Sequence, residues 1–230
     1  MRVLVLALLA AAQVQFDVVS IKPGEPSSPE SSVYPAPHGL RMKNATLKSM
    51  VRMAYELNEY QLDGGPKWLD SALFNVDAKS PAGATVRQIP EMLQALLAER
   101  FKLEFHRETR TLPEYALVAA KGGPKLPAAS EAEKRLTSTS SGDRMIKGRA
   151  ARISDLVHML IAVAGAPVVD RTGIEGQYNF SLEFAPLLGA PDDRLPDVFG
   201  AVQQLGLKLE PIKGPVEVLV IDKAEMPAAN

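Results

Sequence analysis

The stretch Leu47-Lys48-Ser49-Met50-Val51-Arg52-Met53-Ala54-Tyr55 predicts an amphipathic helix, and a second stretch with the same pattern begins 106 positions later, at Ile153. Apolar residues recur in the first stretch at i, i+3, i+4, i+7 and i+8, which places them on one helical face. The second stretch, residues 153–161, has the same spacing. Thr46 suits the N-cap of the first helix. We therefore expect two copies of one structural unit.

The match between the two halves continues beyond these helices. An alternating strand is expected at 74–78 and at 178–184. A second helix follows at 89–93 and at 195–199, where a proline and then a carboxylate suit the free amides of a helix N-terminus. The tetrapeptides Phe101-Lys102-Leu103-Glu104 and Leu207-Lys208-Leu209-Glu210 keep the offset of 106. After a turn, each half is expected to end in a strand, at 114–119 and at 217–222.

These patterns predict an α+β fold of two repeated helix-strand-helix-strand-strand units, with helices packed on mainly antiparallel sheets. An extra strand is expected before each copy, at 16–21 and at 144–147. The segments 23–37 and 187–194 are expected to be surface loops, because they lack a sustained apolar period. The predicted division is a first unit at 16–121, a linker at 122–143 and a second unit at 144–225.

The N-terminal residues have the pattern of a secretory signal. Met1 and Arg2 precede an apolar run over 3–12 that ends in three alanines, the composition of a cleavable bacterial leader. The alternative is a buried first strand at 3–9. We expect a signal peptide at 1–12 and export to the periplasm or the medium. No later stretch has 18 consecutive apolar residues, so no permanent membrane span is expected.

The composition excludes several classes of function. The net charge is −1, from 26 basic and 27 acidic side chains, so no overall field favours nucleic acid. Because the chain has no cysteine, disulfides, thiolate metal sites and cysteine nucleophiles are excluded. The sequence contains no zinc-protease, serine-hydrolase, phosphate-loop or dinucleotide motif. His38, His106 and His158 are far apart, and we expect isolated surface side chains rather than a metal site. No catalytic residue, metal or cofactor is predicted.

Three residues are candidates for ligand binding. Asp170 and Arg171 lie on an expected turn before Gly173, where Arg171 could bind a carboxylate. The structural alternative is that the aspartate satisfies turn amides. Trp68 is the only tryptophan, and with Tyr55 and Tyr60 it could form an exposed aromatic patch. Its structural alternative is a packing anchor.

Three ordered motifs also resemble a known family. They are Phe16-Asp17-Val18-Val19-Ser20-Ile21-Lys22-Pro23, the stretch 169–180 and the closing Val218-Leu219-Val220-Ile221-Asp222. They are similar to the exported DUF3738 proteins, the "Soli" family expanded in Acidobacteria. Some members of that family are joined to a membrane metallopeptidase of the β-lactam-sensor type, which implies an extracytoplasmic sensing or interaction module. This chain has no such peptidase segment, and the family supplies no catalytic residues.

The preferred hypothesis is a non-catalytic exported module that binds an envelope protein or a cell-wall component through sheet edges or between its units. The signal pattern, the repeat and the lack of catalytic motifs favour it. One alternative is an extracytoplasmic ligand sensor, as the family resemblance implies. The other is a hydrolase with a carboxylate site assembled between the units.

Overall fold

The computed structural model describes residues 14–26, 31–36, 39–142, 144–185 and 194–228. The predicted signal peptide, His38 and most of the predicted loop at 187–194 lie outside these residues. The chain divides into two compact units. Unit 1 contains the described residues up to Glu108 and those from Val218 onward, and unit 2 is Thr109–Glu217. Each unit has its own apolar core.

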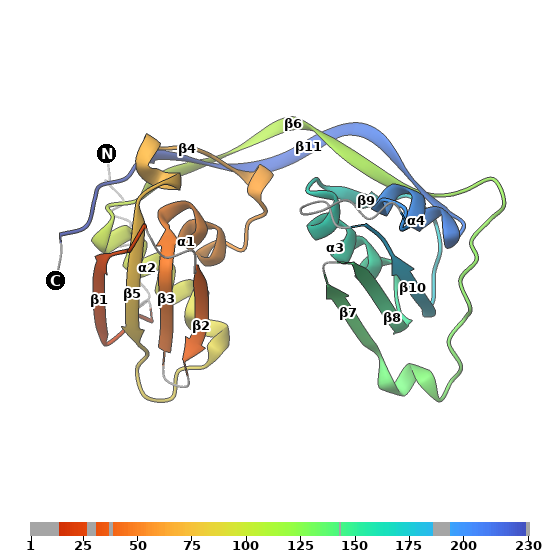
Figure 1. The fold of residues 1–230 in the computed structure, drawn as a ribbon, viewed down its shortest axis with the longest axis horizontal. Coiled ribbons are helices and arrows are strands. Elements are labelled where there is room, and N and C mark those ends of the chain that lie inside the picture. The colour runs from red at the N-terminus through yellow and green to blue at the C-terminus, as the bar shows by residue number, and fades with distance from the viewer. Residues whose placement is uncertain (1–13, 27–30, 37–38, 143, 186–193, 229–230) are drawn as a thin grey trace, which may run out of the picture. The chain divides into compact units, whose positions relative to one another are not determined.

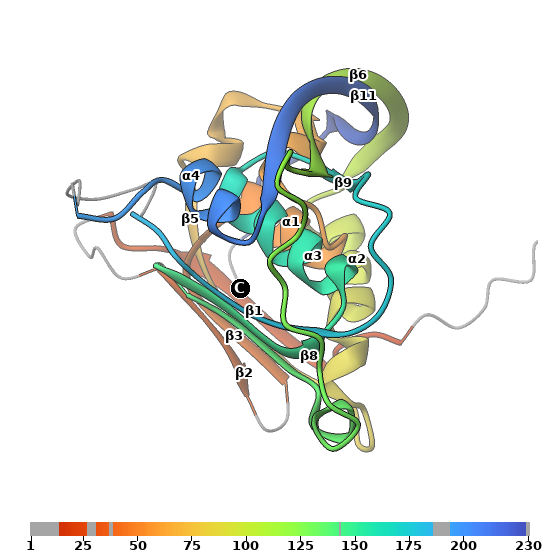
Figure 2. The ribbon, with the colours of Figure 1, turned by 90° about the vertical axis from the view of Figure 1, so that its right-hand side faces the viewer.

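The main sheet of unit 1 has four antiparallel strands in the order β1-β5-β3-β2. They are β1 (Val18–Pro23), β2 (Ser32–Ala36), β3 (Gly39–Thr46) and β5 (Leu73–Lys79). Helices α1 (Leu47–Ala54) and α2 (Ile89–Arg100) lie on one side of this sheet (Figures 1 and 2). The shorter elements are η1 (Glu59–Gln61), β4 (Leu62–Gly64), η2 (Lys67–Asp70) and η3 (Val86–Gln88). Because both helices cover the same face, the other face of the sheet is left open.

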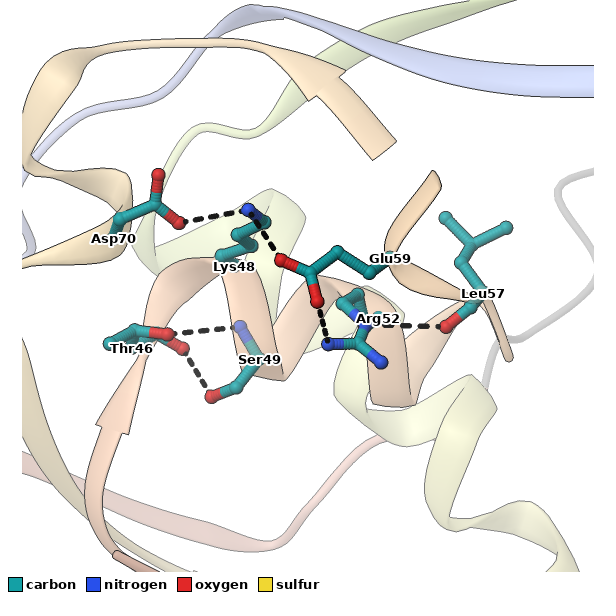
Figure 3. A network of polar contacts seen from close by, with 7 residues as sticks. All are labelled: Thr46, Lys48, Ser49, Arg52, Leu57, Glu59 and Asp70. Carbon is teal, nitrogen blue, oxygen red and sulfur yellow. Dashed lines mark hydrogen bonds and ion pairs between the residues drawn. The ribbon is translucent and has the colours of Figure 1, made fainter. Parts of the chain in front are cut away.

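Helix α1 is held at both ends by polar contacts (Figure 3). Thr46 Oγ1 accepts a hydrogen bond from the Ser49 amide at 3.1 Å, the cap that the sequence predicts. Lys48 lies between Glu59 at 3.5 Å and Asp70 at 3.3 Å. These contacts tie α1 to η1 and η2. Its apolar face is fully buried, as the periodicity predicts: Leu47, Met50, Val51 and Ala54.

The main sheet of unit 2 has three antiparallel strands in the order β10-β8-β7. They are β7 (Ser138–Gly142), β8 (Met145–Ala151) and β10 (Tyr178–Glu183). The remaining elements are η4 (Glu133–Leu136), α3 (Ile153–Ala164), β9 (Val168–Asp170) and α4 (Val198–Gln204). The predicted linker at 122–143 therefore contains η4 and β7. In the described residues, no helix is long and apolar enough to cross a membrane.

Two long strands, β6 (Glu104–Ala119) and β11 (Leu207–Lys223), each begin in one unit and end in the other. They are neighbours in a third sheet of order β4-β11-β6-β9. The end of β11 pairs in parallel with β4 of unit 1, where Leu62 lies opposite Leu219. The end of β6 pairs in the same way with β9 of unit 2, where Val168 lies opposite Tyr115. Each unit is thus completed by a strand that starts in the other.

This exchange corrects the predicted end of each unit. The turn expected between 104 and 114, and its counterpart in the second half, are parts of continuous strands. Pro113, Pro211 and Pro215 all lie inside β6 or β11. A proline is compatible with a strand where its missing N–H is not needed for pairing. The boundaries of the two compact units lie between residues 108 and 109 and between residues 217 and 218, and the division of the repeat at 16–121 and 144–225 stays a prediction.

The two units contain the same irregularity near the end of the strand that precedes a helix, in β3 and in β8. Asn44 and Ala150, 106 positions apart, both have positive φ, at 51° and 47°. The amide of Asn44 donates to Asn75 Oδ1 at 3.0 Å, and the amide of Ala150 donates to Asn179 Oδ1 at 2.9 Å. The two acceptors are only 104 positions apart. A conformation that costs a non-glycine residue about 1 kcal/mol or more is therefore held in the same way in both units.

The offset stays at 104 in the rest of each unit. Phe101 and Leu205 are the C-caps of α2 and α4, and each is followed by a residue with positive φ, Lys102 or Gly206. The tetrapeptide match at an offset of 106 is therefore two residues out of structural register. Pro196, predicted at the first helical position, instead precedes the N-cap Asp197. The α+β class with mainly antiparallel sheets is confirmed.

Candidate functional site: the open face of the unit 1 sheet

Alternation along β3 decides which side chains reach the open face of the unit 1 sheet. Leu40 and Met42 are buried toward the helices, and Arg41 and Lys43 are exposed on the other side. This is the period of two expected for a sheet with one covered face. Residues with the same outward direction on the neighbouring strands complete the face.

The register of the four strands places side chains from all of them in one row. Tyr34 lies opposite Arg41, Arg41 opposite Asp77, and Asp77 opposite Ser20. In the flanking rows, Lys79 lies opposite Val18 and Asn75 opposite Lys22. Directly opposed side chains on adjacent strands are about 5 Å apart at their Cβ atoms. The row therefore forms a continuous surface across the sheet.

This surface is hollowed and predominantly cationic. A shallow, open hollow of about 660 Å³ lies over it. Its lining includes one carboxylate, Asp77, and four cations: Lys22, Arg41, Lys43 and Lys79. A chain with a net charge of −1 thus carries a local excess of positive charge. Such a field attracts anions although the protein as a whole does not.

The Asp77 carboxylate pairs with Arg41, one of the four cations. Arg41 Nη2 and Nε donate to the same oxygen of Asp77, at 2.8 and 3.0 Å. Both side chains are more than half exposed, at 64% and 60%, so the pair is well solvated and contributes little energy. Within the described part of the chain, Lys22 and Lys79 have no carboxylate within ion-pair distance. These two ammonium groups are available to a ligand.

Apolar side chains lie beside the cations. Val18 is 61% exposed and Tyr34 59% exposed, and both line the hollow. A tyrosine combines an apolar ring with a hydroxyl that donates and accepts hydrogen bonds. Ser20 and Asn75 add further polar groups to the lining. The face can therefore hold a ligand that has negative charges, hydrogen-bonding groups and an apolar side.

The structure places the three predicted ligand-binding residues in two different units. Asp170 ends β9, and its Oδ1 accepts hydrogen bonds from the amide and the hydroxyl of Thr172, at 2.8 and 2.7 Å. Arg171 is exposed, and its amide donates to the Leu117 carbonyl at 2.9 Å. The Asp170 carboxylate thus has the turn-stabilising contacts of the structural alternative. Its role in ligand binding stays a prediction.

Trp68 lies in η2 of unit 1 and packs against that unit's core. Its ring meets Phe74 edge-on at 6.3 Å, whereas Tyr55 stacks edge-on with Phe105 at 4.9 Å. Burial raises the pKa of both Tyr55 and Tyr60. These contacts have the geometry of packing anchors.

The two described histidines lie in different units. His106 Nδ1 is 2.8 Å from Asp222 Oδ1, and both residues are about half exposed. His158 is exposed on α3. Among the described residues, no group of three or more histidines and carboxylates has the geometry of a metal site.

The open face was not predicted from the sequence, although its signal is present. Residues 39–43 alternate between apolar and cationic side chains, a pattern typical of a half-buried strand. We predicted a loop at 23–37 and no strand between that loop and α1, so β2 and β3 were both missed. Lys22 and Lys79 lie 57 positions apart, and only the pairing of β1 with β5 brings them to one surface.

The comparisons with known proteins identify a family. The family described as "Protein of unknown function (DUF3738)" matches residues 48–224, which confirms the family predicted from the sequence. No curated protein and no solved structure matches the chain.

Proposed function

Because the chain belongs to the DUF3738 family, whose function is unknown, we propose a function from the site itself: an exported module that binds an acidic envelope glycan on the open face of the unit 1 sheet. The observation that carries this proposal is the hollow with four cations and one carboxylate. The signal pattern at 1–12 supports export. The matching order of elements in the two units supports an origin by internal duplication.

A glycan fits this face better than a peptide does. Extended peptides usually add to a sheet at its edge, through backbone hydrogen bonds, whereas the cations here stand on the face. Arg41 and Lys43 are two residues apart on β3, hence about 7 Å apart along the strand. A polymer with a carboxylate or phosphate at each repeat can meet several such cations. The ring of Tyr34 can pack on the apolar side of a sugar.

The test compares two pairs of lysine substitutions. Lys22→Ser with Lys79→Ser removes the two unpaired cations of the face. Lys121→Ser with Lys125→Ser removes the same charge from exposed positions in unit 2 and is the control. The probe is a carboxylated polysaccharide, polygalacturonate, with uncharged dextran beside it, and binding is measured by biolayer interferometry.

We expect polygalacturonate to bind and dextran not to bind. An exposed ion pair contributes up to about 1 kcal/mol, so loss of two should weaken binding about five- to thirtyfold. The control pair should stay within twofold of wild type. Binding should also weaken as salt is added, because exposed charges are screened. Equal effects of the two pairs, or tight binding that is independent of salt, would contradict the proposal.

A further inference from the structure

We propose that unit 2 carries a second, weaker site for the same acidic glycan, on the open face of the sheet β10-β8-β7; this inference rests on the proposed function. A hollow of about 300 Å³ lies on this sheet. Its lining includes two cations, Lys147 and Arg149, and a group of hydroxyl side chains: Ser138, Thr139, Ser140 and Ser181. Cations and hydrogen-bonding groups thus meet at this hollow, as they do on unit 1.

The two cations have the same structural position as the pair on β3. Lys147 and Arg149 are 106 positions after Arg41 and Lys43, and both pairs precede a strand residue with positive φ and the following helix. On both strands the cations are exposed and alternate with buried residues. A cation pair with the same outward direction is therefore present in each unit.

The buried side of the two strands is packed differently. Met42 fills the core in unit 1, whereas Gly148 stands at the same position of unit 2. A Cβ atom on Gly148 would lie 2.3 Å from the ring of Phe180, so that ring occupies the space in place of a side chain. The residue type has thus changed on the buried side, while the two exposed positions remain basic.

The residues opposite Lys147 indicate that this cation can bind an anion without competition from a directly opposed carboxylate. In unit 1, Asp77 lies opposite Arg41 on β5. Lys147 lies between two serines, Ser181 on β10 and Ser140 on β7. Lys147 thus has a hydroxyl side chain on both sides. Glu183 ends β10 two residues away, and the Arg149 charge acts on Glu133 of η4.

Two sites on one chain give a specific expectation. The unit 2 site has two cations and less than half the volume of the unit 1 site, so it should bind a short oligomer more weakly. A long polymer that reaches both sites should bind more tightly than a short one, because the second contact is intramolecular. The number of short oligomers bound per chain should be two.

The experiment uses the full chain and galacturonate oligomers and polymers of graded length. Calorimetry gives the number of oligomers bound per chain, and biolayer interferometry gives the affinity for the polymer. Three variants are compared with wild type: K147S/R149S, K22S/K79S and both pairs combined. K147Q/R149Q repeats the unit 2 change with longer side chains, and circular dichroism checks that each variant is folded.

We expect two oligomers per wild-type chain and one per chain in each pair variant. K147S/R149S should weaken binding of the long polymer at least tenfold and leave the stronger oligomer site within twofold. A single site in wild type that K147S/R149S leaves unchanged but K22S/K79S removes would overturn the second site and keep the proposed function. Binding that neither pair affects would overturn both. Binding of an acidic peptide in place of galacturonate would overturn the glycan assignment.

Discussion

Replacing Ile221 with alanine should destabilise unit 1. Ile221 lies on β11, a strand that begins in unit 2 and ends in unit 1. Ile221 is 3% exposed and belongs to the core of unit 1. It lies opposite Gly64 on β4, and a Cβ on Gly65 would come within 3.1 Å of its Cγ2 atom. Truncating a buried isoleucine costs about 2–5 kcal/mol. Because glycine backbone on β4 has no side chain to fill the space, we expect about 3–4 kcal/mol.

Hydrogen exchange followed by mass spectrometry separates the two units. I221A should raise the exchange of α1, β3 and β5 and leave α3, β8 and β10 close to wild type, because local opening reports local stability. Leu117→Ala is the mirror change, since Leu117 lies on β6 but is fully buried in the core of unit 2. Val220→Ala, at a half-buried neighbour on β11, should cost less than about 1 kcal/mol. Equal loss of protection in both units after I221A would refute the reasoning.

Two further predictions concern polar contacts inside each unit that stabilise its fold. Asn75→Ala and Asn179→Ala each remove the acceptor of the amide of the positive-φ residue, so each should cost about 1–3 kcal/mol in its own unit, as measured by urea denaturation. Asn75→Asp keeps this acceptor and should cost less, whereas Asn179→Asp is not a suitable control because the Asn179 side-chain amide donates to Glu133 Oε1 at 3.1 Å. Hydrogen bonds from the amide and hydroxyl of Ser130 hold the pKa of the Glu133 carboxyl below its usual value. The ionised Glu133 carboxylate therefore stabilises the folded state above its unfolded-state pKa, and this stabilisation is lost as the pH falls through the lower folded-state pKa. Wild type should therefore lose more stability than Glu133→Gln between neutral and acid pH in the same denaturation assay, and parallel pH profiles would contradict this.

Local patterns predicted the helices, and pairing between distant strands decided the rest. The periodicity from Leu47 and from Ile153 depends only on neighbouring residues, so α1 and α3 were found. The path of β6 depends on its pairing with β9, in which Tyr115 lies opposite Val168, 53 positions later. A single sequence does not show this pairing. We therefore predicted a turn where the strand continues into the other unit. The open face of the unit 1 sheet was missed for the same reason, because its cations meet only through strand register.

Two of the differences between the units have different consequences for the proposed function. At the end of β4, Gly64 and Gly65 make the turn with positive φ, at 75° and 81°. Asp170 occupies the position of Gly64, since it ends β9 opposite Leu117 as Gly64 ends β4 opposite Ile221. Its carboxylate makes the turn by accepting from Thr172. These are two solutions to one structural problem, so the difference at this turn does not require a difference in ligand.

Asp77 of unit 1 and Ser181 of unit 2 stand at matching positions, and both are exposed on the open faces of their sheets. This difference, unlike the one at the turn, lies where a ligand can reach it. It replaces a carboxylate opposite Arg41 with a hydroxyl opposite Lys147. The charge that a ligand meets thus differs between the two faces. Exchanging the two residues, D77S with S181D, should therefore strengthen the binding of a galacturonate oligomer at unit 1 and weaken it at unit 2, without moving either turn. We therefore expect the outer faces of the sheets, where this charge differs, to determine how the two units differ in ligand binding.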